Sequence, residues 1–160
     1  GYTAATGEET GAITLTDLAS IDISASEAVY ADLAEMYISD SSYEAGTVVI
    51  FGGDKEVTQS TMFTDHRVAG VVSNKPAYLM NKDAVAGNPH LEAVAVALRG
   101  KVPCKIDGPI KKGDIIVTGT QPGTGTGLAN DSAMPNAVCV IGKSIEDNND
   151  TGVRLINIVV

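Results

Sequence analysis

Short apolar runs recur along the chain beyond residue 28, each bounded by glycine, proline, asparagine or aspartate. Runs of this length that are rich in valine and isoleucine predict β-strands separated by turns. Many are continuous and do not alternate, which indicates strands covered on both faces, as in a closed barrel or a sandwich. The pattern predicts a mainly β domain of short strands and tight Gly/Pro turns. The predicted strands are Thr47–Phe51, Val68–Val72, Ala93–Leu98, Asp114–Thr118, Ala137–Ile141 and Val153–Val160.

The first part of the chain, residues 1–28, has a different composition. It is rich in threonine, alanine, serine, glycine and acidic residues, with thin alternation at Ile13/Leu15 and Ile21/Ile23. This pattern supports short strands but offers too little apolar area for a core of its own. We therefore predict an extended stalk or linker over residues 1–28, followed by a β-rich domain over residues 29–160.

One window competes with the all-β prediction. Ser24-x-x-Glu27 has the spacing of a capping box, and Val29, Leu33 and Met36 would share one face of a helix. Nothing after Tyr37 continues this period, so an extended segment is favoured here.

Glycine-rich segments predict where the chain turns. Gly52-Gly53-Asp54-Lys55 follows Val48–Phe51, precedes Glu56–Gln59 and predicts a hairpin, because glycine accepts positive φ without steric cost. Asp107-Gly108-Pro109 and Lys112-Gly113-Asp114 bracket only two residues, so the chain must double back there. The segment Gln121–Gly127 is too rich in glycine for a strand and is predicted to be a surface loop.

Charge and hydropathy exclude several classes of function. The chain of 160 residues has a formal net charge of −9, which repels the phosphate backbone of nucleic acids. No apolar run approaches the roughly 20 residues that span a bilayer, so no membrane insertion is expected. The first residues also lack the basic and apolar parts of a signal peptide.

Motifs for metal or cofactor chemistry are weak. No Cys-x-x-Cys or His-x-x-x-His occurs, so no metal ligand set is expected, and Cys104 and Cys139 fit buried thiols. Gly123-x-Gly125-x-Gly127 lacks the spacing of a dinucleotide site, and no cofactor is expected. His66 follows an acid directly, but adjacent side chains on a strand point to opposite faces and do not form an oriented catalytic pair.

An ordered series of motifs across residues 30–160 resembles a known family. The family is the C-terminal intramolecular-chaperone domain of bacteriophage tail spikes, tail fibres and neck appendages, also called the G2 peptidase family, with related structural proteins of cyanophages. The motifs are Asp32-Leu33-Ala34-Glu35, Glu44-Ala45-Gly46-Thr47-Val48, Asp65–Ser73 with Pro76-Ala77-Tyr78, Val96-Ala97-Leu98-x-Gly100-x-Val102-Pro103, Gly108–Asp114 and Val140-Ile141-Gly142-Lys143.

The resemblance implies a β-rich, trimeric domain at the end of a fibrous virion protein. In self-cleaving members the scissile bond precedes the aspartate of an Asp-x-x-Glu segment, and the residue before it is a serine nucleophile. Asp32 and Glu35 match the acidic pair as candidate catalytic residues, but Ala31 stands where the serine would be. A methyl group cannot attack a carbonyl, so this departure from the family pattern argues against self-cleavage.

Three functions are compared on these grounds. The first is a structural module of the virion, a trimeric tail-fibre or appendage tip or assembly cap that contacts other virion proteins. The second is an autoproteolytic chaperone that cleaves before Asp32. The third is host attachment, or carbohydrate binding by a small acidic β-domain, through the loops Lys82–Pro89 and Pro122–Ser132. Asp32 and Glu35 also fit a structural role, capping backbone donors or pairing with Lys143 or Arg67.

Overall fold

The computed structural model describes residues 32–160, and this part of the chain is built from β-strands. It contains one 3-10 turn, at Ala137–Cys139, and none of its helical segments is long and apolar enough to cross a membrane. The strands are β1 (Asp32–Ser39), β2 (Val48–Phe51), β3 (Val57–Gln59), β4 (Val68–Ser73), β5 (Tyr78–Met80), β6 (Glu92–Asp107), β7 (Ile115–Thr118), β8 (Gly125–Leu128), β9 (Val140–Ser144) and β10 (Val153–Val159).

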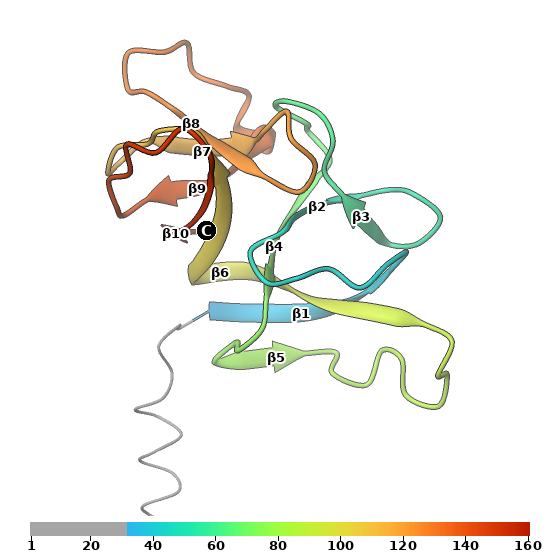
Figure 1. Cartoon of the computed structure of the whole chain (residues 1–160). Helices are drawn as coiled ribbons and strands as arrows, with labels where there is room; N and C mark the ends of the chain where they lie inside the picture. The colour runs from blue at the N-terminus through green and yellow to red at the C-terminus, as the bar shows by residue number, and fades with distance from the viewer. Residues whose placement is uncertain (1–31) are drawn as a thin grey trace, which may run out of the picture.

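The long strand β6 passes through both halves of the domain (Figure 1). Its first part pairs with β1 and β4, and the part after Gly100 pairs with β10 and β8. Gly100 has a φ of 113°, a conformation that a residue with a side chain rarely adopts. Glycine at this position allows one strand to serve two sheets that face in different directions.

Each part of β6 belongs to a closed ring of strands. The first barrel runs β1–β6–β4–β2–β3 and closes where Ser39 pairs with Val57, while β5 adds a parallel edge to β1. The second barrel runs β6–β10–β9–β7–β8 and closes where Ile106 pairs with Gly125. Closing a sheet in this way removes exposed backbone edges.

The two barrels share a hydrophobic core. The interior of the first barrel holds a cluster of buried valines, which are Val49, Val57, Val72, Val94 and Val96. Their sequence neighbours Val48, Val71 and Ala97 point the other way and pack with Ile106, Ile116 and Ile158 of the second barrel. The first barrel therefore buries both faces of β2 and β4, as the continuous apolar runs predicted.

A glycine-rich turn between β7 and β8 docks onto the first barrel. The backbone N–H of Val48 donates to the carbonyl of Gly123 at 2.9 Å, and the N–H of Gly123 donates to the carbonyl of Ser60 at 2.8 Å. A Cβ on Gly123 would lie 2.8 Å from the Thr47 side chain, so only glycine fits this contact. This turn and β6 hold the barrels together.

Most strand predictions are confirmed, with three differences. The segment Gln121–Gly127 is not a surface loop, because Gly123–Gly125 are buried and Gly125 begins β8. The run Ala137–Ile141 is split between a 3-10 turn and β9. The predicted strand at Ala93–Leu98 is the first half of a longer strand.

The other predictions on chain organisation have mixed outcomes. The hairpin at Gly52–Lys55 is confirmed by the antiparallel pairing of β2 with β3. Asp32–Ser39 form a strand, so the extended alternative is correct for these residues. The predicted stalk, residues 1–28, lies outside the described residues and stays a prediction.

Replacing Gly142 by alanine tests the packing of β9 on β10. A Cβ at this position would lie 2.1 Å from the carbonyl oxygen of Val159, a backbone atom that cannot rotate away. We expect Gly142→Ala to lower the free energy of unfolding by about 1–3 kcal/mol, the usual cost of overpacking. Gly152→Ala is the control, because its Cβ would meet nothing closer than Arg154 at 3.9 Å. Urea denaturation measures the free energy of unfolding of both variants. If the two variants are equally stable, the close packing of β9 on β10 at Gly142 is contradicted.

Candidate functional site

The two candidate carboxylates, Asp32 and Glu35, lie on opposite faces of β1. Side chains on a strand alternate, so residues three apart point to opposite sides. Asp32 shares its face with the buried Ala34, whereas Glu35 shares the other face with Tyr37. Within one chain the strand therefore separates the acidic pair, and the two carboxylates do not act on one atom.

Asp32 is a buried carboxylate. Its exposed fraction is 1%, and neither carboxylate oxygen has a hydrogen-bond partner among the described residues. Burial raises the pKa of this carboxyl group, and the nearby hydroxyl of Ser73 on β4 opposes the rise only in part. The backbone of Asp32 is well held, because its carbonyl accepts from the N–H of Ala77 at 2.9 Å. Burial without a partner therefore disfavours the charged form of the side chain.

Glu35 has a different environment. Its carboxylate accepts a hydrogen bond from the hydroxyl of Tyr37, with 2.9 Å between the oxygens. Burial raises the pKa of Tyr37, and the bond to Glu35 adds to the rise. Glu35 therefore positions an aromatic side chain that packs on the valine cluster of the first barrel.

The predicted ion pairs of Asp32 or Glu35 with Lys143 or Arg67 are wrong for the part of the chain that is described. Arg67 pairs instead with Asp65, and Lys143 lies on β9 of the second barrel, without an ion pair to any residue in 32–160. The acidic pair therefore has no cationic partner within this range.

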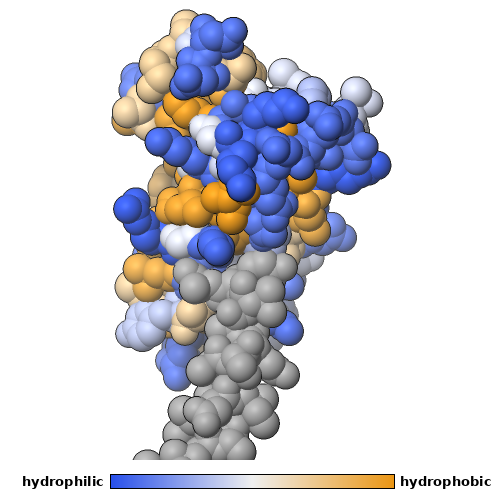
Figure 2. Space-filling model, turned by 90° about the vertical axis from the view of Figure 1, so that its left-hand side faces the viewer, coloured by the Kyte–Doolittle hydropathy of each residue, from blue (hydrophilic) through white to orange (hydrophobic). Residues whose placement is uncertain are grey.

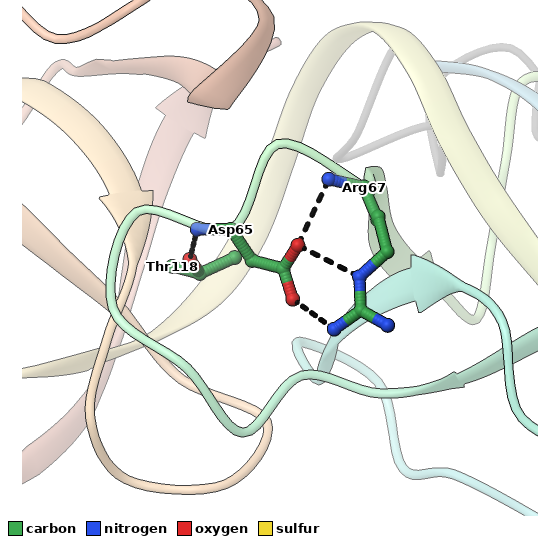
Figure 3. A network of polar contacts seen from close by, with 3 residues as sticks. All are labelled: Asp65, Arg67 and Thr118. Carbon is green, nitrogen blue, oxygen red and sulfur yellow. Dashed lines mark hydrogen bonds and ion pairs between the residues drawn. The ribbon is translucent and has the colours of Figure 1, made fainter.

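A second buried carboxylate, Asp65, is fully paired (Figure 3). It accepts from the Nε of Arg67 at 3.0 Å, from its NH2 at 2.7 Å and from its backbone N–H at 2.9 Å. The guanidinium of Arg67 holds the pKa of Asp65 below its usual range. The N–H of Asp65 donates to the hydroxyl of Thr118 on β7 at 2.7 Å, so this group ties the barrels together. Its neighbour His66 is exposed, which fits a turn.

The remaining sequence motifs do not form a reactive group. Cys104 and Cys139 are free and buried, and burial raises the pKa of the Cys104 thiol to about 12, which keeps it unreactive. His90 is exposed in the loop before β6. Within residues 32–160 no three histidine, cysteine or acidic side chains gather as metal ligands.

Sequence reasoning missed two polar residues that matter here. Ser73 approaches Asp32 and Thr118 binds Asp65, each from a distant strand. No local signal in the sequence announces either contact, because both depend on which strands pair. The contact between Asp65 and Arg67 did have a signal, since an aspartate that begins a turn often accepts from the backbone N–H two residues on.

Comparison with known proteins gives one structural likeness. No family model matches the chain, and no curated protein matches it. Among solved structures it is similar to the crystal structure of pre-mature gene product 12 of bacteriophage phi29, with a TM-score of 0.54 and 14% identity. The match covers 82% of this chain and 22% of the phage protein, so the chain spans less than a quarter of that protein's length. The domain shares its fold with part of a phage protein.

The buried carboxylate of Asp32 predicts a pH-dependent stability difference. Because its folded pKa is raised, the group favours folding below its ordinary pKa, and that contribution is lost as pH rises through the folded pKa. We expect Asp32→Asn to stabilise the domain at pH 7 by about 1–3 kcal/mol, because an amide has no charge to bury, whereas the carboxyl must either be buried charged without a partner or take up a proton. The gain should vanish at about pH 3.5, where the wild-type carboxyl is protonated.

Thermal unfolding at the two pH values measures this difference. Asp54→Asn, on the exposed turn after β2, is the matched control and should change nothing. If Asp32→Asn is destabilised at pH 7, the carboxylate has a hydrogen-bond donor, and the interpretation of a buried carboxyl without a partner fails.

Proposed function

We propose that this domain is a structural module of a bacteriophage virion, a trimeric tip or assembly cap of a tail fibre or appendage. The observation that supports this most is the fold shared over 82% of the chain with gene product 12 of phage phi29. The ordered motifs from Asp32 to Lys143 agree with it, because they resemble the chaperone domains of such proteins. Other virion proteins are then its partners, and the virion is its location.

The fold suits an assembly cap for a physical reason. Its core lies within one chain, so the domain folds before it associates. Both barrels are closed, and the short strand β5 is the main edge left on the first. Copies would therefore associate through side-chain faces, without continuing a sheet from one copy to the next. Raising the local concentration of three stalk segments lowers the entropic cost of ordering them.

Light scattering coupled to size exclusion tests the proposed trimer. At micromolar concentration the 160-residue chain should elute with three times the mass of one chain. A monomer would contradict the assembly-cap function, because a cap that does not associate cannot bring stalks together.

An autoproteolytic chaperone is the second candidate. It is favoured by the buried acid at Asp32, directly after the expected scissile bond, and by the word "pre-mature" in the description of the phi29 protein. Two features weigh against it: Ala31 offers no nucleophile, and Glu35 points to the other face of β1.

Mass spectrometry separates the two candidates. The 160-residue chain, which contains the Ala31–Asp32 bond, should keep its full mass during expression and storage. Hydrolysis between Ala31 and Asp32 would give two products whose summed mass exceeds the intact chain by one water. That result would establish cleavage and replace the purely structural function.

Host attachment through surface loops stays a prediction and is ranked below the two candidates above. Residues 82–90 form successive turns with mostly exposed side chains, as a contact loop requires. The other predicted loop, Pro122–Ser132, fits less well, because its first half is buried between the barrels.

A further inference from the structure

The outer face of β10 is apolar and exposed. Val153, Leu155 and Val159 point outward from the second barrel, with exposed fractions of 36%, 59% and 38%. Alternation along a strand places these three on one side, while Ile156 and Ile158 face the core. At about 3.3 Å per residue the row is about 20 Å long. Figure 2 shows hydrophobic surface gathered in the middle of one side of the molecule, between hydrophilic areas.

Lysines flank one end of this row. Val159 pairs with Lys101 on one side and with Lys143 on the other, and directly opposed residues share a face. The ion pairs of the described chain join Arg67 to Asp65, Lys105 to Glu44 and Arg154 to Asp150, so Lys101 and Lys143 have no carboxylate partner there. Asn157 lies between Leu155 and Val159 on the same face and binds Glu146, so the row has one polar position, and Lys101 and Lys143 stand beyond it at the Val159 end.

The residues before β1 have the complementary chemistry. Residues 1–31 contain no lysine or arginine, and their acidic residues are Glu8, Glu9, Asp17, Asp22 and Glu27. Ile21, Ile23 and Glu27 fall at odd positions, which share one side of an extended strand. Ile21 and Ile23 are therefore suited to contact the apolar row, and Glu27 is suited to pair with the lysines at its end.

The start of β1 lies beside the lysine end of the row. β1 begins at Asp32 opposite Gly100, the neighbour of Lys101, and Gly100 exchanges backbone hydrogen bonds with Val160. The chain outside the described part therefore joins the domain beside the lysine end of the row. About ten extended residues span about 30 Å, enough to cover the row of a neighbouring copy in an assembly.

We propose that the face formed by Val153, Leu155, Val159, Lys101 and Lys143 binds the acidic segment 1–31 of a neighbouring copy. The inference rests on the proposed trimer and names the contact that would hold it. A segment passed from each copy to the next is a heterologous contact, which closes into a ring under three-fold symmetry. The lysines select the acidic segment, and the apolar row supplies the buried area.

Crosslinking between differently tagged copies tests the occupant of this face. One full-length chain carries Ser24→Cys and the other Val153→Cys, and a flexible bismaleimide joins thiols within reach. The native Cys104 and Cys139 are buried, and the chain without added cysteines measures the crosslinking that they contribute. We expect a covalent product that carries both tags. Asp54→Cys in the first barrel replaces Val153→Cys as the control and should give none.

Charge reversal tests the lysines separately. We expect Lys101→Glu with Lys143→Glu to weaken the trimer about tenfold in dissociation constant at low salt, with a smaller effect at high salt. Lys111→Glu with Lys112→Glu changes the net charge equally on a turn away from the row and should leave association unchanged.

The outcomes separate this inference from the proposed function. A trimer that gives no two-tag product, or that gives a product only when both cysteines lie in one chain, overturns the inference and leaves the trimer standing. A monomer overturns both. A two-tag product that the lysine reversals weaken supports both.

Discussion

The hydrogen bonds of one strand, β6, hold both barrels of this domain. Before Gly100, β6 pairs with β1 and β4, and after Gly100 it pairs with β10 and β8. The two barrels therefore cannot separate unless hydrogen bonds of β6 break. A conformation with φ of 113° is needed at the bend, and glycine supplies it without strain. The hydrogen bond from the N–H of Asp65 to the Thr118 hydroxyl and the turn at Gly123 give two further links between the barrels.

This constraint explains how a small domain presents a defined surface. Because the barrels are locked together, the outer face of β10 and the start of β1 keep a fixed relation at Gly100. The chain therefore enters β1 at Asp32 next to Lys101. A loosely tethered pair of barrels would offer no such fixed geometry, and the proposed cap function requires it.

Much of the fold could be predicted because β-branched runs and turn residues agree locally, as at Val48–Ile50 and Gly52–Gly53. The prediction failed at Gln121–Gly127, where glycine permits close packing. A Cβ on Gly125 would lie 2.9 Å from Ile116, a contact that no local pattern reveals. At the candidate site, Asp32 and Glu35 could be named only through the resemblance to the phage chaperone family. The burial of Asp32 beside Ser73 was not, because it depends on which strands enclose β1.

Native-state hydrogen exchange tests the central claim, that β6 makes the two barrels one cooperative unit. Amides of β2 report on the first barrel and those of β9 on the second. As denaturant rises toward the unfolding transition, the opening free energies of both sets should converge on one global value, together with those of β6. If the amides of β9 open at a separate, lower free energy while β2 stays protected, the barrels unfold independently and the account is contradicted.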